Sequence, residues 1–206
     1  MRKSIVIDLD NTLLATNTFK RYIMFVGMQA LKLGRIDICI SVACMVIWRK
    51  LRLISHEKMK KIILVSTRNF MTKPKINAFI KKLTPMQNVK VLELLSIYSS
   101  KDYLSILSTA APISYAEEIA FHYGFKEVVA TGMIINKEWK ENFGETKKQA
   151  TMELLKKRNA DIAVFVTDHS DDLPLLLVPK ERNILVNPTP HSLEKIQKAK
   201  VSYELL

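Results

Sequence analysis

The residues best suited to chemistry lie near the start of the chain, in Asp8-Leu9-Asp10-Asn11-Thr12, directly after the apolar run Ile5-Val6-Ile7. In an extended chain, residues two apart share a face, so Asp8 and Asp10 would bring two negative charges together. This crowding is unfavourable unless a cation neutralises the carboxylates or the chain turns sharply after Asp8. The segment predicts either ligand chemistry at the carboxyl end of a buried strand or a solvated turn of Asp and Asn.

Hydroxyl and lysine side chains follow two later predicted elements. Ser108 and Thr109 come directly after the predicted strand 103–107. Near a helix start, a hydroxyl beside unpaired N–H groups can hold a phosphoryl oxygen, although capping the helix is the commoner role. Lys147 and Lys148 open another predicted helix, where most lysines are solvated. Each pair leaves two interpretations open.

Acidic residues follow the predicted buried strand 162–166. They are Asp168, Asp171 and Asp172. Carboxylates in this place suit Mg²⁺, a hard cation that takes oxygen ligands. Because Mg²⁺ prefers oxygen, we expect His169 to be a packing or hydrogen-bonding neighbour and not a metal ligand.

The elements that must position these residues alternate between strands and helices over most of the chain. This alternation predicts an α/β fold, a Rossmann-like, doubly wound and mostly parallel sheet. The predicted strands are 4–7, 103–107, 127–130, 162–166 and 184–186, and the predicted helices between them are 89–98, 115–123 and 147–157.

An all-helical insertion interrupts this pattern after the first strand. Between residues 16 and 83, apolar residues recur at helical spacing and no strand alternation occurs. Ser55 can cap a third helix with Phe70 on its inner side, Pro74 is expected to break that helix, and 76–83 is expected to form a fourth. We therefore predict an α/β core of residues 1–14 and 84–206 and a helical domain of residues 15–83.

The positive charge of the chain is concentrated in this insertion. The net charge is +12, and residues 15–83 hold 15 Lys and Arg against Asp37 and Glu57 only. The asymmetry indicates an anionic partner, which would be a phospholipid surface, a phosphorylated substrate or nucleic acid. Alternatively, the basic residues simply solvate the outer helix faces. Nucleic acid is the unlikely partner, because no recognised nucleic-acid-binding module is present.

The remaining composition is that of a globular protein. The chain has 206 residues, of which 48% are hydrophobic and 25% charged, which argues against disorder. Cys39 and Cys44 lie in an apolar stretch without other metal ligands at suitable spacing, so we expect reduced core thiols. With no signal peptide expected, the predicted location is cytoplasmic.

Taken together, the four polar segments closely resemble the four motifs of the haloacid dehalogenase superfamily of phosphohydrolases. The insertion falls where that superfamily carries its C1 cap. Thr109-Ala110-Ala111-Pro112 is similar to the T/S-A-S-P variant of the phosphoserine-phosphatase-like branch, and Val186-Asn187-Pro188 is similar to its V-N-P ending. The four segments are Asp8–Thr12, Ser108–Pro112, Gly144–Lys147 and Asp168–Asp172.

This resemblance implies a Mg²⁺-dependent phosphomonoester hydrolase with an aspartyl-phosphate intermediate. Asp8 would be the nucleophile, and Asp10 would protonate the leaving oxygen and then activate water. Mg²⁺ would be bound by the Asp8 carboxylate, the Asp10 main-chain carbonyl and Asp168. Asp172 would complete the metal shell, directly or through water.

The resemblance also implies residues that bind the phosphoryl group. Thr109 and Lys147 would neutralise and orient it. Asn11 would contribute an N–H, and Asn11 and Thr12 would shape the loop. Ser108 competes with Thr109, and Lys148 with Lys147, although Pro112 and the Gly-Glu-x-Lys spacing favour Thr109 and Lys147.

The sequence departs from the family pattern at two positions. Thr167 replaces the usual glycine before the fourth-motif aspartate, and His169 replaces a serine. Neither change removes a required charge. Asp171 is a spare carboxylate between the two expected acids.

The substrate is expected to depend on the cap. Its basic residues stand next to aromatic ones, as in Phe19-Lys20-Arg21-Tyr22 and Trp48-Arg49-Lys50, which suits the edge of an anionic membrane. The cap is similar to that of the branch that dephosphorylates phosphatidylglycerophosphate. This favours a lipid phosphate as substrate and peripheral membrane contact. The alternatives are a soluble phosphometabolite such as phosphoserine, or a phosphate-binding protein without turnover.

Overall fold

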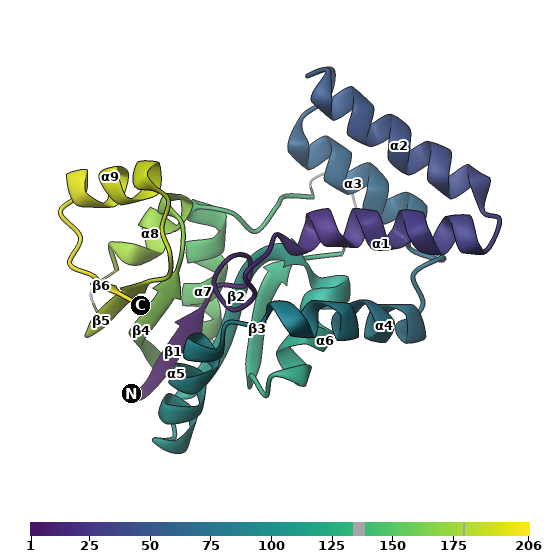
Figure 1. Cartoon of the computed structure of the whole chain (residues 1–206). Helices are drawn as coiled ribbons and strands as arrows, with labels where there is room; N and C mark the ends of the chain where they lie inside the picture. Colours follow the sequence, from purple (N-terminus) through teal and green to yellow (C-terminus); the bar gives the residue numbers. More distant parts are fainter. Residues whose placement is uncertain (134–138, 179) are drawn as a thin grey trace.

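The computed structural model describes residues 1–133, 139–178 and 180–206. In this part of the chain, one sheet of six parallel strands has the order β3-β2-β1-β4-β5-β6 (Figure 1). The predicted α/β fold is confirmed. The strands are β1 (Arg2–Ile7), β2 (Leu104–Pro112), β3 (Glu127–Thr131), β4 (Ala160–Thr167), β5 (Arg182–Leu185) and β6 (Glu204–Leu205).

Helices cover both faces of the sheet, and the alternating side chains of β1 show how. Ile5 and Ile7 belong to one buried cluster, whereas Val6 between them belongs to a second cluster on the opposite face. The first cluster includes side chains of α5 (Val89–Ser100) and α6 (Ile113–His122). The second includes side chains of α7 (Glu145–Lys157), α8 (Leu173–Leu176) and α9 (Pro190–Lys198).

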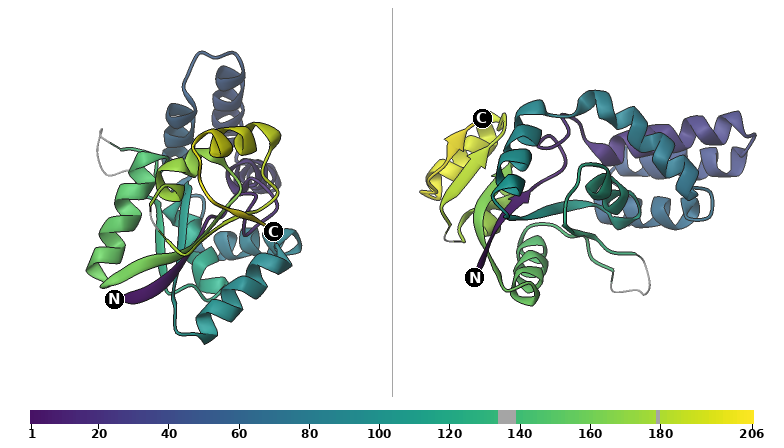
Figure 2. Two further views of the ribbon diagram at one scale, coloured as in Figure 1. Left: turned by 90° about the vertical axis from the view of Figure 1, so that its left-hand side faces the viewer. Right: turned by 90° about the horizontal axis from the view of Figure 1, so that it is seen from below.

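The helical insertion contains α1 (Thr18–Lys32), α2 (Ile36–Lys50), α3 (His56–Thr67) and α4 (Lys73–Leu83). The first three helices extend away from the sheet beyond the carboxyl end of β1, and α4 lies beside α6 (Figure 1). The same arrangement is visible from the side and from below (Figure 2). Among the described residues, none of the helices has both the length and the apolar character needed to cross a membrane.

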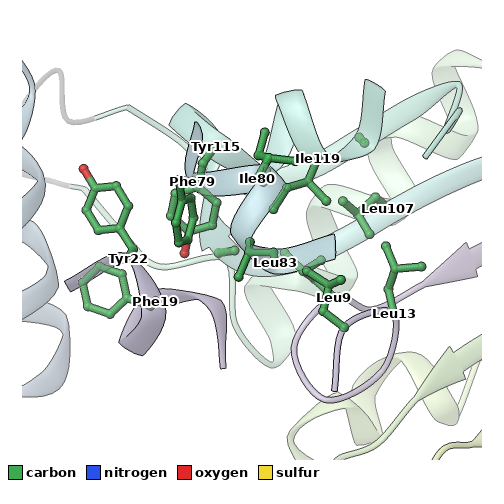
Figure 3. Packing of buried hydrophobic residues seen from close by; sticks show 14 of the residues in the cluster. Leu9, Leu13, Phe19, Tyr22, Phe79, Ile80, Leu83, Leu107, Tyr115 and Ile119 are labelled. Carbon is green, nitrogen blue, oxygen red and sulfur yellow. The ribbon is translucent and has the colours of Figure 1, made fainter. Parts of the chain in front are cut away.

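Buried aromatic rings join the insertion to the core. Tyr22 of α1 stacks on Tyr115 of α6 with ring centroids 5.3 Å apart, and Phe79 of α4 meets Tyr115 edge-on at 5.5 Å (Figure 3). The Thr18 and Tyr115 hydroxyls are hydrogen-bonded at 3.2 Å. Such ring pairs contribute about 0.5–1.5 kcal/mol each beyond the area they bury, so this cluster fixes the base of the insertion.

Some element boundaries differ from those predicted. β2 continues to Pro112, because Pro112 still pairs with Thr131 of β3. α3 is capped by Ser55, as predicted, but it ends at Thr67, so Phe70 lies beyond it. Pro74 does not break this helix; it lies in the first turn of α4, where a missing N–H costs nothing.

Three elements near the carboxyl terminus were not predicted, namely α8, α9 and β6. α8 has four residues and β6 has two, which is too short for a periodic pattern. α9 carries a recognisable start signal, because the Thr189 side chain accepts the Ser192 N–H at 3.2 Å and Pro190 follows.

Candidate active site

A tight turn follows β1 and separates the first two acids. The Asp8 N–H extends the sheet by donating to the Val166 carbonyl at 2.9 Å. The Asp8 carbonyl then accepts the Leu13 N–H at 3.3 Å, so the chain closes on itself within five residues. Asn11 adopts a left-handed conformation with φ 56°, which Asn tolerates better than most residues. The sharp turn, one of the two ways to avoid crowding the carboxylates, is therefore present.

Asp10 lies where the turn leads into α1. Its Oδ1 accepts the Thr18 main-chain N–H at 2.7 Å. Burial raises the pKa of Asp10, and the bond from Thr18 opposes that effect only in part. A carboxyl with a raised pKa is suited to carry and transfer a proton.

Lys147 links the carboxylates of two motifs. Its Nζ donates to Asp8 Oδ1 at 2.7 Å and to Asp172 Oδ2 at 2.8 Å, and all three side chains are buried. Burial lowers the pKa of Lys147, but the carboxylates of Asp172 and Asp8 outweigh it and raise the pKa overall. Burial raises the pKa of Asp8 to about 7 despite this ammonium. Thr167, the departure from the family's glycine, donates its hydroxyl to Asp172 Oδ2 at 2.7 Å.

Asp168 faces the same space from the end of β4. Its Oδ1 accepts the Thr12 hydroxyl at 3.4 Å. Burial is the main cause that raises its pKa to about 6, while His169 and the Asn11 side chain oppose the rise. A positive charge bound next to this carboxylate would stabilise its ionised form.

The two hydroxyls of the second motif point in different directions. The Ser108 hydroxyl is hydrogen-bonded to the Thr151 hydroxyl of α7 at 2.8 Å, away from the acids. Thr109 lines the cavity above the acids, and its Oγ1 accepts the Ala111 N–H at 3.0 Å. Both residues lie within β2 and not at the helix start that the sequence suggested.

The other residues singled out in the sequence lie at the margin of the site. Lys148 points outward and pairs with Glu145 at 3.2 Å. His169 and Asp171 pair with each other, with Nδ1 and Oδ2 2.9 Å apart. The main-chain N–H of Asn11 donates to the Thr16 carbonyl at 3.2 Å, which leaves its side-chain amide as the N–H that lines the cavity.

A cavity of about 600 Å³ lies between these acids and the helical insertion. The core contributes the acids, Thr109 and Lys147, and the insertion contributes side chains of α1 and α3. The lining residues from the insertion and the segment before it are Asn17, Phe19, Ser55, His56, Glu57 and Lys60.

One ion pair in this cavity was not predicted from the sequence. Lys60 of α3 is only 2% exposed; its Nζ donates to the Ala110 carbonyl at 2.7 Å and pairs with Glu141. His56 Nδ1 lies 3.7 Å from the other oxygen of Glu141. Although burial raises the pKa of Glu141, its bonds to His56 and Lys60 lower it overall. The partners are 81 positions apart, and only the regular apolar spacing around Lys60 could have placed it on the inner face of α3.

The donor set suits a hard cation. Among the described residues, no three His, Cys, Asp or Glu side chains are arranged to hold a metal by themselves. The ligand set expected from the sequence does not consist of side chains alone. It combines the carboxylates of Asp8 and Asp168 with the main-chain carbonyl of Asp10. All of these ligands are oxygens, and burial raises the pKa of Asp8 and of Asp168, so a cation bound between them would stabilise their ionised forms. The residues therefore fit Mg²⁺.

The fold and this site define a known class of enzyme. The family model described as haloacid dehalogenase-like hydrolase matches residues 5–177. The chain belongs to this family, so its assignment to the hydrolases is confirmed. No protein with a curated description matches the sequence.

Solved structures share the fold at low sequence identity. A protein of unknown function from Bordetella pertussis Tohama I has a TM-score of 0.79 and 18% identity over 100% of this chain and 98% of that one. A phosphoserine phosphohydrolase-like protein from Francisella tularensis has a TM-score of 0.58 and 17% identity, covering 99% and 94%. A phospho-aspartyl intermediate analogue of phosphoserine phosphatase has a TM-score of 0.60 and 14% identity, covering 99% and 91%.

Replacing Lys147 should destabilise the protein much more than replacing its neighbour. Lys147→Met leaves two buried carboxylates without their cation, so the free energy of unfolding should fall by about 3–5 kcal/mol at pH 8 in EDTA. Lys148→Met, the matched control, should change it by less than about 0.5 kcal/mol. Urea denaturation measures both values, and equal effects would contradict the description of Lys147 as the buried cation.

Asp168 should destabilise the metal-free protein at neutral pH. Its folded-state pKa of about 6 lies above the ordinary 3.8, so this penalty develops as the pH rises through that interval. Asp168→Asn should therefore be more stable than the wild type by about 1–3 kcal/mol at pH 8 in EDTA, with little difference at pH 4. Urea denaturation across this range tests the sign, and a variant less stable at pH 8 would refute it.

The Lys60–Glu141 pair should couple the insertion to the core. A double-mutant cycle with Lys60→Met and Glu141→Gln should give a coupling energy of about 0.5–3 kcal/mol, because the pair is largely shielded from solvent and each single change removes the charged partner of the other residue. The exposed pair Lys198–Glu194 is the control and should give about 0.5 kcal/mol or less. Unfolding experiments at one ionic strength measure both cycles, and similar values would argue against a buried link.

Proposed function

We propose that this protein is a phosphomonoester hydrolase that works through an aspartyl-phosphate, with residues 15–83 as its cap. The observation that carries this proposal is the position of Asp8. Its carboxylate is buried at the end of the central strand, held by Lys147 and open to the cavity that Thr109 also lines. This combination supplies a fixed nucleophile and groups that neutralise a phosphoryl charge.

In the first half-reaction, an oxygen of Asp8 attacks the phosphorus and the bond to the leaving-group oxygen breaks. Asp10 gives its proton to that oxygen, so an alcohol departs and an acyl phosphate remains on Asp8. The raised pKa of Asp10 supports this role, because its proton is retained until the leaving group needs it.

In the second half-reaction, Asp10 acts as a base. It takes a proton from water, the resulting hydroxide oxygen attacks the phosphorus, and the bond to Asp8 breaks. Inorganic phosphate leaves, the Asp8 carboxylate is restored and Asp10 is again protonated. One residue can perform both proton transfers because they occur on the same side of the phosphoryl group.

The other residues of the site hold the phosphoryl group. Lys147 supplies a positive charge, and Thr109 and the side-chain amide of Asn11 supply hydrogen bonds from the cavity wall. Mg²⁺, when bound by Asp8, Asp168 and the Asp10 carbonyl, with Asp172 completing its shell, would neutralise charge that the ammonium does not reach.

The substrate that we propose is a phosphate ester carried on a lipid, such as phosphatidylglycerophosphate. The excess of basic residues in the cap supports this substrate. The same excess supports our proposal that the cap contacts the cytoplasmic face of an anionic membrane. The second candidate is a small soluble ester such as phosphoserine. The charged residues Lys60, Glu141 and His56 in the cavity favour a polar leaving group, which either class can supply.

Phosphate release decides whether the chain is an enzyme and on what it acts. With Mg²⁺, the wild type should release phosphate from phosphomonoesters, and Asp8→Asn should reduce kcat by more than about a thousandfold. Asp171→Asn is the matched control, because it removes a carboxylate from the cavity rim, and it should retain activity.

The same assay separates the substrate classes. Turnover of phosphatidylglycerophosphate in vesicles that is faster than turnover of phosphoserine supports a lipid substrate. Saturable turnover of phosphoserine without lipid supports the soluble substrate. A wild type that releases no phosphate from either class would instead indicate a phosphate-binding protein.

A further inference from the structure

Helix α2 is apolar on two opposite sides. Ile38, Val42 and Met45 are buried against the rest of the insertion. A second apolar row, displaced by two residues, is exposed to solvent. At 100° per residue, this displacement places the second row almost directly opposite the first. The exposed row, called the outer face of α2 below, consists of Ile36, Ile40, Ala43 and Ile47.

This outer face is unusual for a surface helix. A helix at the surface of a globular protein normally carries polar residues opposite its buried stripe, and one that is apolar all round is normally covered. Each of the three isoleucines is more than half exposed. Trp48 and, in the turn that follows, Leu51 and Leu53 continue the exposed apolar surface. A contiguous surface of this kind marks an interaction site.

Basic residues flank the outer face at both ends. Lys32 and Arg35 precede α2, and Arg49, Lys50 and Arg52 follow Trp48. Asp37, the acidic residue in the first turn of α2, is paired with Arg35 at 2.7 Å, so this pair adds no net charge and the net positive charge at this end comes from Lys32. The partner should therefore have an apolar interior and an anionic surface.

We propose that the outer face of α2 inserts into the headgroup region of an anionic lipid bilayer. An isoleucine row with a flanking tryptophan and basic ends is the composition of a helix that lies in a membrane interface. Each basic residue near an anionic surface strengthens the binding further. This inference deepens the proposed lipid-phosphate function and rests on it for its purpose.

A second copy of the chain fits the same face less well. A symmetric contact through α2 would bring two insertions together, and residues 15–83 hold 15 basic residues against two acidic ones. Like charges around an apolar contact oppose association, whereas anionic lipids neutralise them. The position of α2 also suits a bilayer, because α2 lies at the far end of the insertion from the sheet (Figure 1).

Binding of the full-length chain to vesicles tests the apolar part of this proposal. Vesicles of phosphatidylcholine with phosphatidylglycerol should bind the wild type, and Ile40→Ser/Ile47→Ser should weaken binding by at least about tenfold. Both positions are exposed, so the variant should fold. Phe121→Ser is the matched control, because Phe121 is an exposed apolar residue of α6, and its binding should equal that of the wild type.

Charge variants and fluorescence provide independent measurements. Arg49→Gln/Lys50→Gln should weaken vesicle binding by about tenfold or more, whereas Lys156→Gln/Lys157→Gln, which removes the same charge from α7 in the core, should not. The chain has two tryptophans, and Trp139 is buried. The emission shift to shorter wavelength on binding should therefore come from Trp48 and disappear in Trp48→Phe.

Three results would overturn the inference. They are absence of binding to the anionic vesicles at low salt, unchanged binding of the isoleucine variant, and a dimer in sedimentation velocity that this variant abolishes, which would assign the face to a second copy. Phosphate release from a soluble aryl phosphate is measured in parallel. Vesicle binding without phosphate release would support the docking face and refute the proposed function.

Discussion

The site is organised by one buried ammonium group. Lys147 lies on the first turn of α7 and holds Asp8, at the end of β1, and Asp172, beyond β4, through a single nitrogen atom. Burial would otherwise push both carboxyl groups toward their neutral forms or out into solvent. The arrangement ties α7 to the point where the strand order reverses, which is where open α/β sheets bind ligands. The carboxylates of Asp8, Asp168 and Asp172 line the same cavity as this ammonium, and burial raises the pKa of Asp8 and Asp168. A further cation would stabilise their ionised forms, which is why these residues fit Mg²⁺.

Much of the fold could be predicted from the sequence. Short apolar runs such as Ile5–Ile7, alternating with amphipathic helices, favour buried strands, and parallel strands gather their carboxyl ends at one edge. The choice between neighbours was harder. Ser108 and Thr109 are consecutive residues of a strand, so their side chains point to opposite faces of the sheet. Lys147 and Lys148 are consecutive residues of a helix, so their side chains are separated by a rotation of about 100° around its axis. Motif spacing favoured Thr109 and Lys147. In the structure, the Ser108 hydroxyl is bonded to Thr151 and the Lys148 ammonium is paired with Glu145, so neither alternative contacts the acids of the site through these bonds.

Other features depend on contacts between residues that are far apart in the sequence, which local sequence patterns do not reveal. The end of β2 was placed too early because the pairing of Pro112 with Thr131 comes from a neighbouring strand and not from local propensity. Lys60 was counted only as part of the basic charge of the insertion. Its burial depends on Glu141 and on the Ala110 carbonyl, which reach it only after the insertion has folded over the core. A lysine of this kind looks like any surface lysine until its partners are known.

The hydrogen bond between Asp10 and Thr18 connects the candidate active site to the helical insertion. Thr18 is the first residue of α1, so its N–H belongs to the positive end of that helix dipole, and the carboxylate that accepts it serves as a second cap beside Asn17. Asp10, which we propose transfers the proton, is therefore directly attached to the first turn of the insertion. A tilt of α1 that lengthens this bond removes a donor from Asp10 and strengthens its hold on the proton. The pKa of Asp10 therefore depends on the position of α1.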